Sequence, residues 1–260
     1  MIIDVIGTGS AYEPWGVNAS VRVIEKSFNL LIDCGPTVPQ ALLRRAMDCN
    51  LIDAIYFTHC HPDHCLGLTT LINYWQHAGR VKPLTLYAQR EQWPHLQHLA
   101  SFGLWPGHQC RFIMDWQDSK GLTAIGPWPC QTAISRHPVR NLSLWLRSPH
   151  GSLFYSGDGR PTRHNQSWLE AADVVFQECQ SSEALLPRAN HGDWPLCQKL
   201  VRKAGSLLCP YHTGPEHQAA VRQGAAALAD VRVPEAGDRI ELHNGNWHFI
   251  TADSEREMLE

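Results

Sequence analysis

The feature that most constrains this chain is a run of metal-ligand side chains between His59 and His64. Three imidazoles and the carboxylate of Asp63 follow directly after the apolar run 54–58, which is typical of a buried strand. In an extended chain His59 and His61 project to the same side, so both can bind one metal ion. The sequence therefore predicts a buried strand that ends at a metal site.

The residues after His61 change the direction of the chain. Pro62 fixes its own φ angle and suits the first turn of a helix, so it predicts a helix that begins here. That turn directs Asp63 and His64 toward a second metal ion. Imidazole and carboxylate ligands favour zinc, with iron or manganese as alternatives. A histidine-rich surface loop that binds metal adventitiously is the competing interpretation, but it lacks the strand and helix that preform a site.

Length and composition fit a single domain with a substantial core, which we assign to residues 1–260. Of the 260 residues, 43% are hydrophobic. The 22 basic and 25 acidic residues give a formal net charge of −3, which provides no general attraction for a long polyanion. A local basic patch is compatible with this balance, so nucleic acid is disfavoured without being excluded.

The first residues and the cysteines predict a cytoplasmic protein. Residues 1–7 carry an acid and no Lys/Arg cluster, and their apolar run is too short for a secretion signal. No stretch approaches the roughly 18 apolar residues of a membrane-spanning helix, so we expect no membrane partner. The nine cysteines form no Cys-x-x-Cys pair, which favours reduced thiols.

Short apolar runs alternate with turns and helical patterns, which predicts an α/β fold with two groups of strands and helices outside them. The segment 104–128, rich in Trp, Pro and Gly, is expected to be a surface loop. The expected strands are 2–6, 21–24, 30–32, 54–58, 84–88, 132–135, 142–146, 153–155, 174–176, 207–209, 239–242 and 247–250. The expected helices are 38–47, 65–75, 91–102, 195–204 and 216–228.

The His-x-His-x-Asp-His pattern resembles the signature of the metallo-β-lactamase superfamily, whose fold is a four-layer αβ/βα sandwich with the metals at one edge. The resemblance implies three further ligands, each after a strand: a His, an Asp in a Gly-rich turn, and a late His. His137, Asp158 and His212 fit these places. The likeness then implies two zinc ions per chain, with Asp158 bridging both. The remaining ligands would be His59, His61 and His137 on one ion and Asp63, His64 and His212 on the other.

Smaller motifs resemble the ribonuclease Z-like phosphodiesterase branch of that superfamily. They are Gly7-Thr8-Gly9-Ser10, Asn18-Ala19-Ser20, Leu31-Ile32-Asp33-Cys34-Gly35, Ser156-Gly157-Asp158-Gly159-Arg160-Pro161-Thr162 and Gln177-Glu178-Cys179. His191 also lies 21 residues before His212, where that branch carries a catalytic histidine. The resemblance implies a phosphodiesterase that uses metal-bridged hydroxide attack.

The chemistry of phosphodiester cleavage gives three residues catalytic roles. Asp63 can accept a proton from the attacking water. An alkoxide leaving group also needs a proton, which a histidine outside the ligand set can supply while a carboxylate holds its ring. We expect His191 to be this acid and Glu178 its orienting partner. The alternative for His191 is an ordinary surface loop, because Asn190-His191-Gly192-Asp193 is turn-like.

We expect three residues within these motifs to contact the substrate: Arg160, Thr162 and Ser20. For Arg160 a structural ion pair is an equally good interpretation. Trp105, Trp116 and Trp128 would either stack on a base or pack in the core or a dimer surface.

Only 21 positions separate His137 from Asp158, which leaves no room for the long arm typical of ribonuclease Z enzymes that mature transfer RNA. This favours a small phosphodiester, first a cyclic nucleotide. The alternatives are an endoribonuclease acting on RNA 3′ ends, a lactone, thioester or β-lactam hydrolase on the same metal site, and a metal-binding protein without turnover. From the resemblance alone we expect a homodimer.

Overall fold

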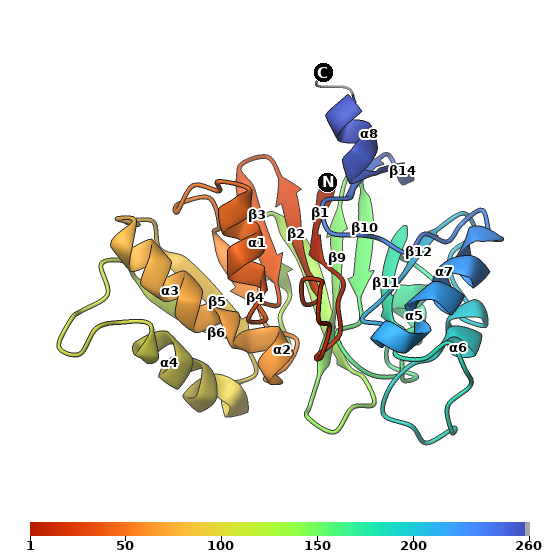
Figure 1. The fold of residues 1–260 in the computed structure, drawn as a ribbon, viewed down its shortest axis with the longest axis horizontal. Helices are drawn as coiled ribbons and strands as arrows, with labels where there is room; N and C mark the ends of the chain where they lie inside the picture. Colours follow the sequence, from red (N-terminus) through yellow and green to blue (C-terminus); the bar gives the residue numbers. More distant parts are fainter. Residues whose placement is uncertain (258–260) are drawn as a thin grey trace.

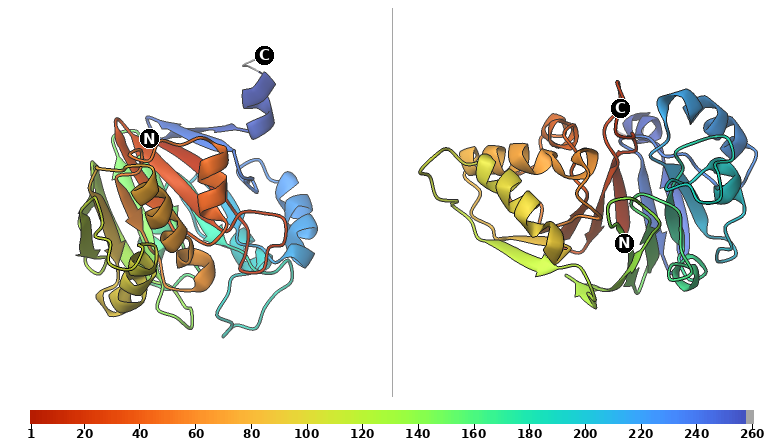
Figure 2. Two further views of the ribbon diagram at one scale, coloured as in Figure 1. Left: turned by 60° about the vertical axis from the view of Figure 1, so that its left-hand side comes forward. Right: turned by 90° about the horizontal axis from the view of Figure 1, so that it is seen from below.

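The computed structural model describes residues 1–257, which form two β-sheets that face each other. Helices cover the outer face of each sheet, so the layers follow the order helix, sheet, sheet, helix (Figure 1). Two further views show the same layers from the side and from below (Figure 2). The expected four-layer α/β sandwich is confirmed.

The first sheet has eight strands in the order β14-β13-β1-β2-β3-β4-β5-β6. Neighbours from β3 to β6 run parallel, and the other pairs are antiparallel. The strands are β1 (Ile2–Gly7), β2 (Ser20–Glu25), β3 (Phe28–Ile32), β4 (Ala54–Tyr56), β5 (Leu84–Ala88), β6 (Met114–Asp118), β13 (Arg239–His243) and β14 (Asn246–Ile250).

The second sheet has six strands in the order β12-β11-β10-β9-β8-β7. Its last three strands in sequence are parallel to one another, and the rest pair antiparallel. The strands are β7 (Ala124–Ile125), β8 (Trp128–Ile134), β9 (Leu142–Ser148), β10 (Gly151–Tyr155), β11 (Val174–Glu178) and β12 (Leu207–Tyr211).

The helices of the first half cover the first sheet, and most of those of the second half cover the second sheet (Figure 1). None of the helices within residues 1–257 is long and apolar enough to cross a membrane. The helices are α1 (Val38–Arg44), α2 (Pro62–Cys65), α3 (Gly67–His77), α4 (Trp93–Phe102), α5 (Gln166–Leu169), α6 (Trp194–Gln198), α7 (Gln218–Ala226) and α8 (Ala252–Glu257), with 3₁₀ turns η1 (Arg90–Gln92) and η2 (Pro215–His217).

Alternation along the buried strands explains the layers. In β3, Leu30 and Ile32 belong to the core between the two sheets, whereas Leu31 packs in the core under the helices. In β11, Phe176 faces the other sheet and Val175 faces the helices of the second half. Strands buried on both faces read as continuous apolar runs, which is why the sequence marked them clearly.

The carboxyl ends of the parallel strands place the chemistry at one edge of the sandwich, beside α2 (Figure 1). His59 follows β4 and Asp158 follows β10. Glu178 is the last residue of β11, and His212 follows β12 directly. Ligands commonly bind outside the carboxyl ends of parallel strands, so this edge is where a site is expected.

Two expectations about secondary structure are corrected. The segment 104–128 contains β6 and β7, because Met114–Asp118 alternates half-buried and exposed residues and pairs with β5. The helix expected over 195–204 ends at Gln198. Beyond it, Arg202 pairs with Asp230 and Lys203 with Asp173, and these tertiary contacts hold the chain in a non-helical path to β12.

Candidate metal centre

The segment after β4 has the conformation that the sequence predicts. Thr58 N–H donates to Asp33 Oδ1 at 2.8 Å, which ties the strand end to the end of β3. His61 is extended, with φ −73° and ψ 150°, and Pro62 is the first residue of α2. His59 Nε2 therefore lies 3.0 Å from His61 Nδ1. The helical turn directs Asp63 and His64 toward a different group of side chains, which includes His212.

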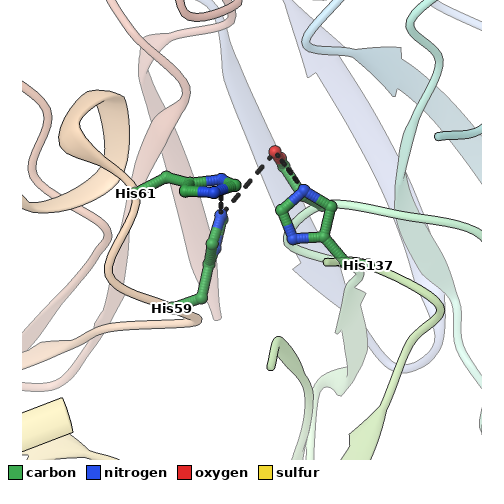
Figure 3. A group of neighbouring side chains, drawn as sticks. His59, His61 and His137 are labelled. Atoms are coloured by element: carbon green, nitrogen blue, oxygen red, sulfur yellow. Dashed lines mark hydrogen bonds and ion pairs between the residues drawn. The ribbon is translucent and has the colours of Figure 1, made fainter. Parts of the chain in front are cut away.

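The first group of candidate ligands comprises His59, His61, His137 and Asp158, whose donor atoms lie within 4.8 Å of one another. His59 and His61 approach from one side and His137 from the other (Figure 3). Asp158 Oδ2 lies 3.8 Å from His59 Nε2 and 3.6 Å from His137 Nε2.

The second group comprises Asp63, His64, Asp158 and His212, all buried and again within 4.8 Å. The other oxygen of Asp158, Oδ1, lies 3.2 Å from His64 Nε2 and 3.5 Å from His212 Nε2. Each oxygen of this carboxylate thus faces one group, as a bridging ligand requires. All seven expected ligand residues come together.

The donor atoms fit metal ions. His64 Nε2, His137 Nε2 and Asp158 Oδ1 are buried and, within residues 1–257, make only ion-pair contacts that lack hydrogen-bond geometry, although buried polar atoms are normally hydrogen-bonded. Burial lowers the pKa of His59, His61 and His137, to about 4 for His137, so these imidazoles are neutral near pH 7. Neutral imidazole is the form that binds a metal, and together with carboxylates it suits zinc.

Asp33 contacts a candidate ligand, although the sequence showed it only as part of a motif. Its side chain is fully buried, and Oδ2 lies 2.9 Å from His64 Nδ1 and accepts from the Thr58 hydroxyl at 2.8 Å. Burial opposes a charge on His64, but the carboxylates of Asp158 and Asp33 raise its pKa. A carboxylate behind a ligand histidine fixes the tautomer and the ring direction.

The turn that carries Asp158 depends on Asn141 and on two glycines. Asn141 Oδ1 accepts from Asp158 N–H at 3.1 Å, and Asn141 Nδ2 donates to Ser156 O at 2.8 Å. Gly157 and Gly159 have φ angles of 63° and 96°, and a Cβ on Gly159 would lie 2.3 Å from a backbone oxygen. Only glycine fits this turn.

The expected acid and its partner are in contact. His191 Nδ1 lies 2.9 Å from Glu178 Oε1, and Glu178 Oε2 accepts from the backbone of Gly192 at 2.6 Å and of Gly159 at 3.2 Å. Glu178 is fully buried, whereas the His191 side chain is 36% exposed. The Glu178 hydrogen bond raises the pKa of His191 against the effect of burial.

Each of the three expected substrate contacts is engaged by a group of the protein itself. Ser20 is fully buried and donates to Asp33 O at 2.8 Å, so its role is structural. The Thr162 hydroxyl donates to Ile134 O at 2.9 Å. Arg160 forms an ion pair with Asp193 at 2.9 Å, which corresponds to the structural interpretation that the sequence had left open.

Two of the three tryptophans pack against other side chains of the protein, and the third is exposed. Trp128 is fully buried and its indole N–H donates to Glu25 Oε2, and Trp116 packs near Trp93 with ring centroids 6.3 Å apart. Packing therefore accounts for both, while Trp105 is 67% exposed.

The model of one protein family, the Anti-Pycsar protein Apyc1 family, matches residues 1–230. The chain belongs to this family. The Apyc1 protein of Paenibacillus harenae is 33% identical over 217 residues, which is 80% of this chain and 89% of that protein. Another Apyc1 protein, from Saccharibacillus brassicae, is 40% identical over 68 residues, and this match spans 26% of the chain and 28% of that protein.

Solved structures share the fold of this Apyc1-family chain. The metallo-β-lactamase fold protein YhfI from Bacillus subtilis matches 92% of the chain and 97% of its own length, with a TM-score of 0.77 and 18% identity. Human tRNase Z, short form, matches 93% of the chain and 99% of its own length, with a TM-score of 0.75 and 16% identity. These structures confirm the expected metallo-β-lactamase fold. The resemblance to ribonuclease Z also has sequence support, because the ribonuclease Z of Methanosarcina mazei is 34% identical over 86 residues, which is 33% of this chain and 28% of that protein.

Proposed function

We propose that this protein is a dinuclear zinc phosphodiesterase that hydrolyses a small phosphodiester, first among them a cyclic nucleotide. The observation that carries the proposal is a carboxylate shared by two ligand groups, next to a histidine that is held by a buried glutamate. The protein is a metal-dependent hydrolase.

The two ligand groups divide the metals between them. His59, His61 and His137 would hold one ion, Asp63, His64 and His212 the other, and Asp158 both. When bound, such a pair of ions activates water and neutralises charge on a phosphoryl group. Asp63 combines two roles in this proposal, because it also accepts a proton from the attacking water.

His191 supplies the proton for the leaving group. Its Nδ1 is engaged by Glu178, so the proton to be transferred is the one on Nε2. The ring lies next to that of His137, at the edge of the first ligand group. A thioester hydrolase has no need of such an acid, because a thiolate leaves without a proton, whereas the alkoxide released from a phosphodiester needs one.

The size of the substrate follows from the connection between His137 and Asp158. Strands β9 and β10 with their short turn fill it almost completely, so no long arm extends from this part of the chain. The protein therefore has no arm here to bind a transfer RNA, whereas a small phosphodiester needs no such arm. An endoribonuclease acting on RNA ends is the second candidate, since human tRNase Z has the same fold.

One panel of assays tests the proposal. Metal analysis is combined with turnover of bis-p-nitrophenyl phosphate, cyclic nucleotides, a precursor transfer RNA and a lactone. We expect two ions per chain and turnover of a cyclic nucleotide, with weak transfer RNA binding that disappears as salt rises. Efficient, salt-resistant cleavage of the precursor would replace the proposal by the second candidate. Hydrolysis of the lactone alone would reject both.

We further propose a homodimer in the cytoplasm. Large apolar side chains, Phe102, Trp105 and Ile113, are 84%, 67% and 69% exposed at the end of α4 and in the segment after it, and a second copy would cover such a surface. All nine cysteines are free thiols, which suits a reducing compartment. Light scattering tests the dimer, and a single-chain mass in solution would reject it. Cell fractionation tests the location.

A further inference from the structure

Arg160 lies two residues after the candidate bridging ligand, and its guanidinium is committed to the protein's own acceptors. Nη2 pairs with Asp193 Oδ2 at 2.9 Å. Nη1 donates to the backbone oxygen of His191 at 3.2 Å and to that of Leu186 at 3.4 Å. The side chains of the ion pair are only 13% and 3% exposed. Arg160 therefore contacts the loop that carries His191 at three points.

The backbone of Arg160 is fixed to the metal edge. Arg136 N–H donates to Arg160 O at 2.8 Å, and Arg160 N–H donates to Arg136 O at 3.2 Å. Arg136 directly precedes His137, and Gly159, next to Arg160, donates to Glu178. The backbone of Arg160 is thus fixed between the turn of Asp158 and the segment that carries His137.

Asp193 closes the other side of this connection. Its Oδ2 also accepts from Leu185 N–H at 3.1 Å, and its Oδ1 accepts from Leu196 N–H at 2.8 Å at the start of α6. Leu185 and Asp193 enclose the segment that contains His191. One carboxylate consequently joins the two ends of this loop to a helix terminus and to Arg160.

We propose that Arg160 and Asp193 are a positioning pair that sets His191 at the metal edge, and that Arg160 is not a phosphate contact. Glu178 fixes the imidazole of His191 through Nδ1, and Arg160 fixes the backbone oxygen of the same residue. Both the side chain and the main chain of His191 are thereby connected to the turn that carries Asp158. This inference rests on the proposed function, because it assumes that His191 donates a proton.

Proton transfer depends steeply on distance, and a displacement of about 1 Å costs on the order of 10²-fold in rate. Loss of the ion pair should therefore slow the step in which His191 protonates the leaving group. A group that merely binds phosphate would instead change the affinity for every phosphodiester.

The test compares Arg160→Gln, Asp193→Asn and the double variant on two substrates, bis-p-nitrophenyl phosphate and the cyclic nucleotide that the wild type turns over best. We expect each single variant to lower kcat on the cyclic nucleotide roughly 10- to 100-fold, with KM nearly unchanged. The loss on bis-p-nitrophenyl phosphate should be much smaller, because nitrophenolate leaves without a proton. The double variant should lose no more than the worse single variant, because the two residues act as one unit.

Arg163→Gln is the matched control, since Arg163 is an exposed arginine of the same turn region. Arg160→Lys keeps the positive charge but offers one nitrogen in place of the two that reach Asp193 and the backbone oxygens. Positioning predicts a lower kcat for this variant on the cyclic nucleotide with little change on bis-p-nitrophenyl phosphate, whereas a phosphate contact predicts a raised KM on both substrates. It also serves as the milder substitution if the glutamine variant does not fold.

Three results would overturn the inference: a raised KM on both substrates for Arg160→Gln with Asp193→Asn unaffected, equal losses on both substrates, or full activity of both single variants. Failure of the proposed function is distinguishable, because it appears already as absent cyclic nucleotide turnover in the wild type.

Discussion

The imidazole rings of His137 and His191 lie edge to face, with centroids 5.1 Å apart and planes at 75°. The first ring belongs to a group of side chains that could hold a metal ion, and the second does not. Replacing His191 with Ala should therefore leave both metals bound and lower turnover of an alkoxide ester by about 10²–10⁴-fold. On bis-p-nitrophenyl phosphate the loss should be much smaller. Steady-state kinetics and metal analysis check both statements.

His164→Ala is the control for this prediction, because His164 is an exposed histidine in a neighbouring loop. Equal losses on the two substrates would mean that His191 binds phosphate instead of donating a proton. Unchanged rates on both would make it an ordinary surface residue.

Glu178 should set the pH range in which His191 works. The hydrogen bond from Glu178 raises the pKa of His191. The acid acts in its protonated form, so activity is present below this pKa and is lost as the pH rises through it. Glu178→Gln removes the negative charge and should lower the pKa, which shifts the alkaline limb of kcat/KM for an alkoxide ester to lower pH. A pH–rate profile measures the shift, and an unmoved alkaline limb would refute it.

Asp33 should influence metal affinity through its contact with the candidate ligand His64. Its carboxylate is buried against His64 Nδ1 and carries the hydrogen bonds from Thr58. Asp33→Asn should weaken metal binding about 10–100-fold, as is typical of residues that orient a ligand histidine. Competition with a chelator measures this affinity, with the exposed Asp48→Asn as control. Wild-type affinity in Asp33→Asn would show that His64 is held by other contacts.

Asp158 should be the least replaceable ligand. Although burial opposes its charge, His212 and His64 hold its pKa well below the ordinary value, so the carboxylate is ionised and faces both ligand groups. Asp158→Ala should lose at least one ion and most of the activity, because within residues 1–257 Asp158 is the one residue that belongs to both candidate ligand groups and can offset the repulsion between the two cations. Full metal content in the purified variant would show that the bridge is misassigned.

Some of this site could be predicted from sequence because its signals are local. His59, His61, Asp63 and His64 lie within one strand end and one turn, so periodicity alone indicated which side chains share a side. Residues 30–32 of β3 and 174–176 of β11 were clear because these parts of the strands are apolar throughout. The late ligands were placed only by resemblance, since nothing local distinguishes His137 from other histidines that follow a strand.

The parts that sequence did not predict depend on distant partners. Arg160 meets Asp193 and Ser20 meets Asp33 through the folded chain, and neither contact has a sequence spacing that signals it. Arg202 and Asp230 end the expected helix after α6 in the same way. β6 is different: Met114–Asp118 does alternate, but the turn residues around it obscured a signal that was present.

The candidate metal centre can form only late in folding, because its ligands come from distant parts of the chain. His212 Nε2 and Asp63 Oδ2 lie 3.1 Å apart although 149 positions separate them in the chain. Closing so long a loop is entropically costly, and the cost is met only when the two sheets pack against each other. The centre is thus a product of folding and not a nucleus for it, and the metal-free chain should fold before it binds ions. Ions that bind only the folded state would then join the two halves of the molecule. A chelator should lower the melting temperature measured by circular dichroism without abolishing the folded spectrum at room temperature.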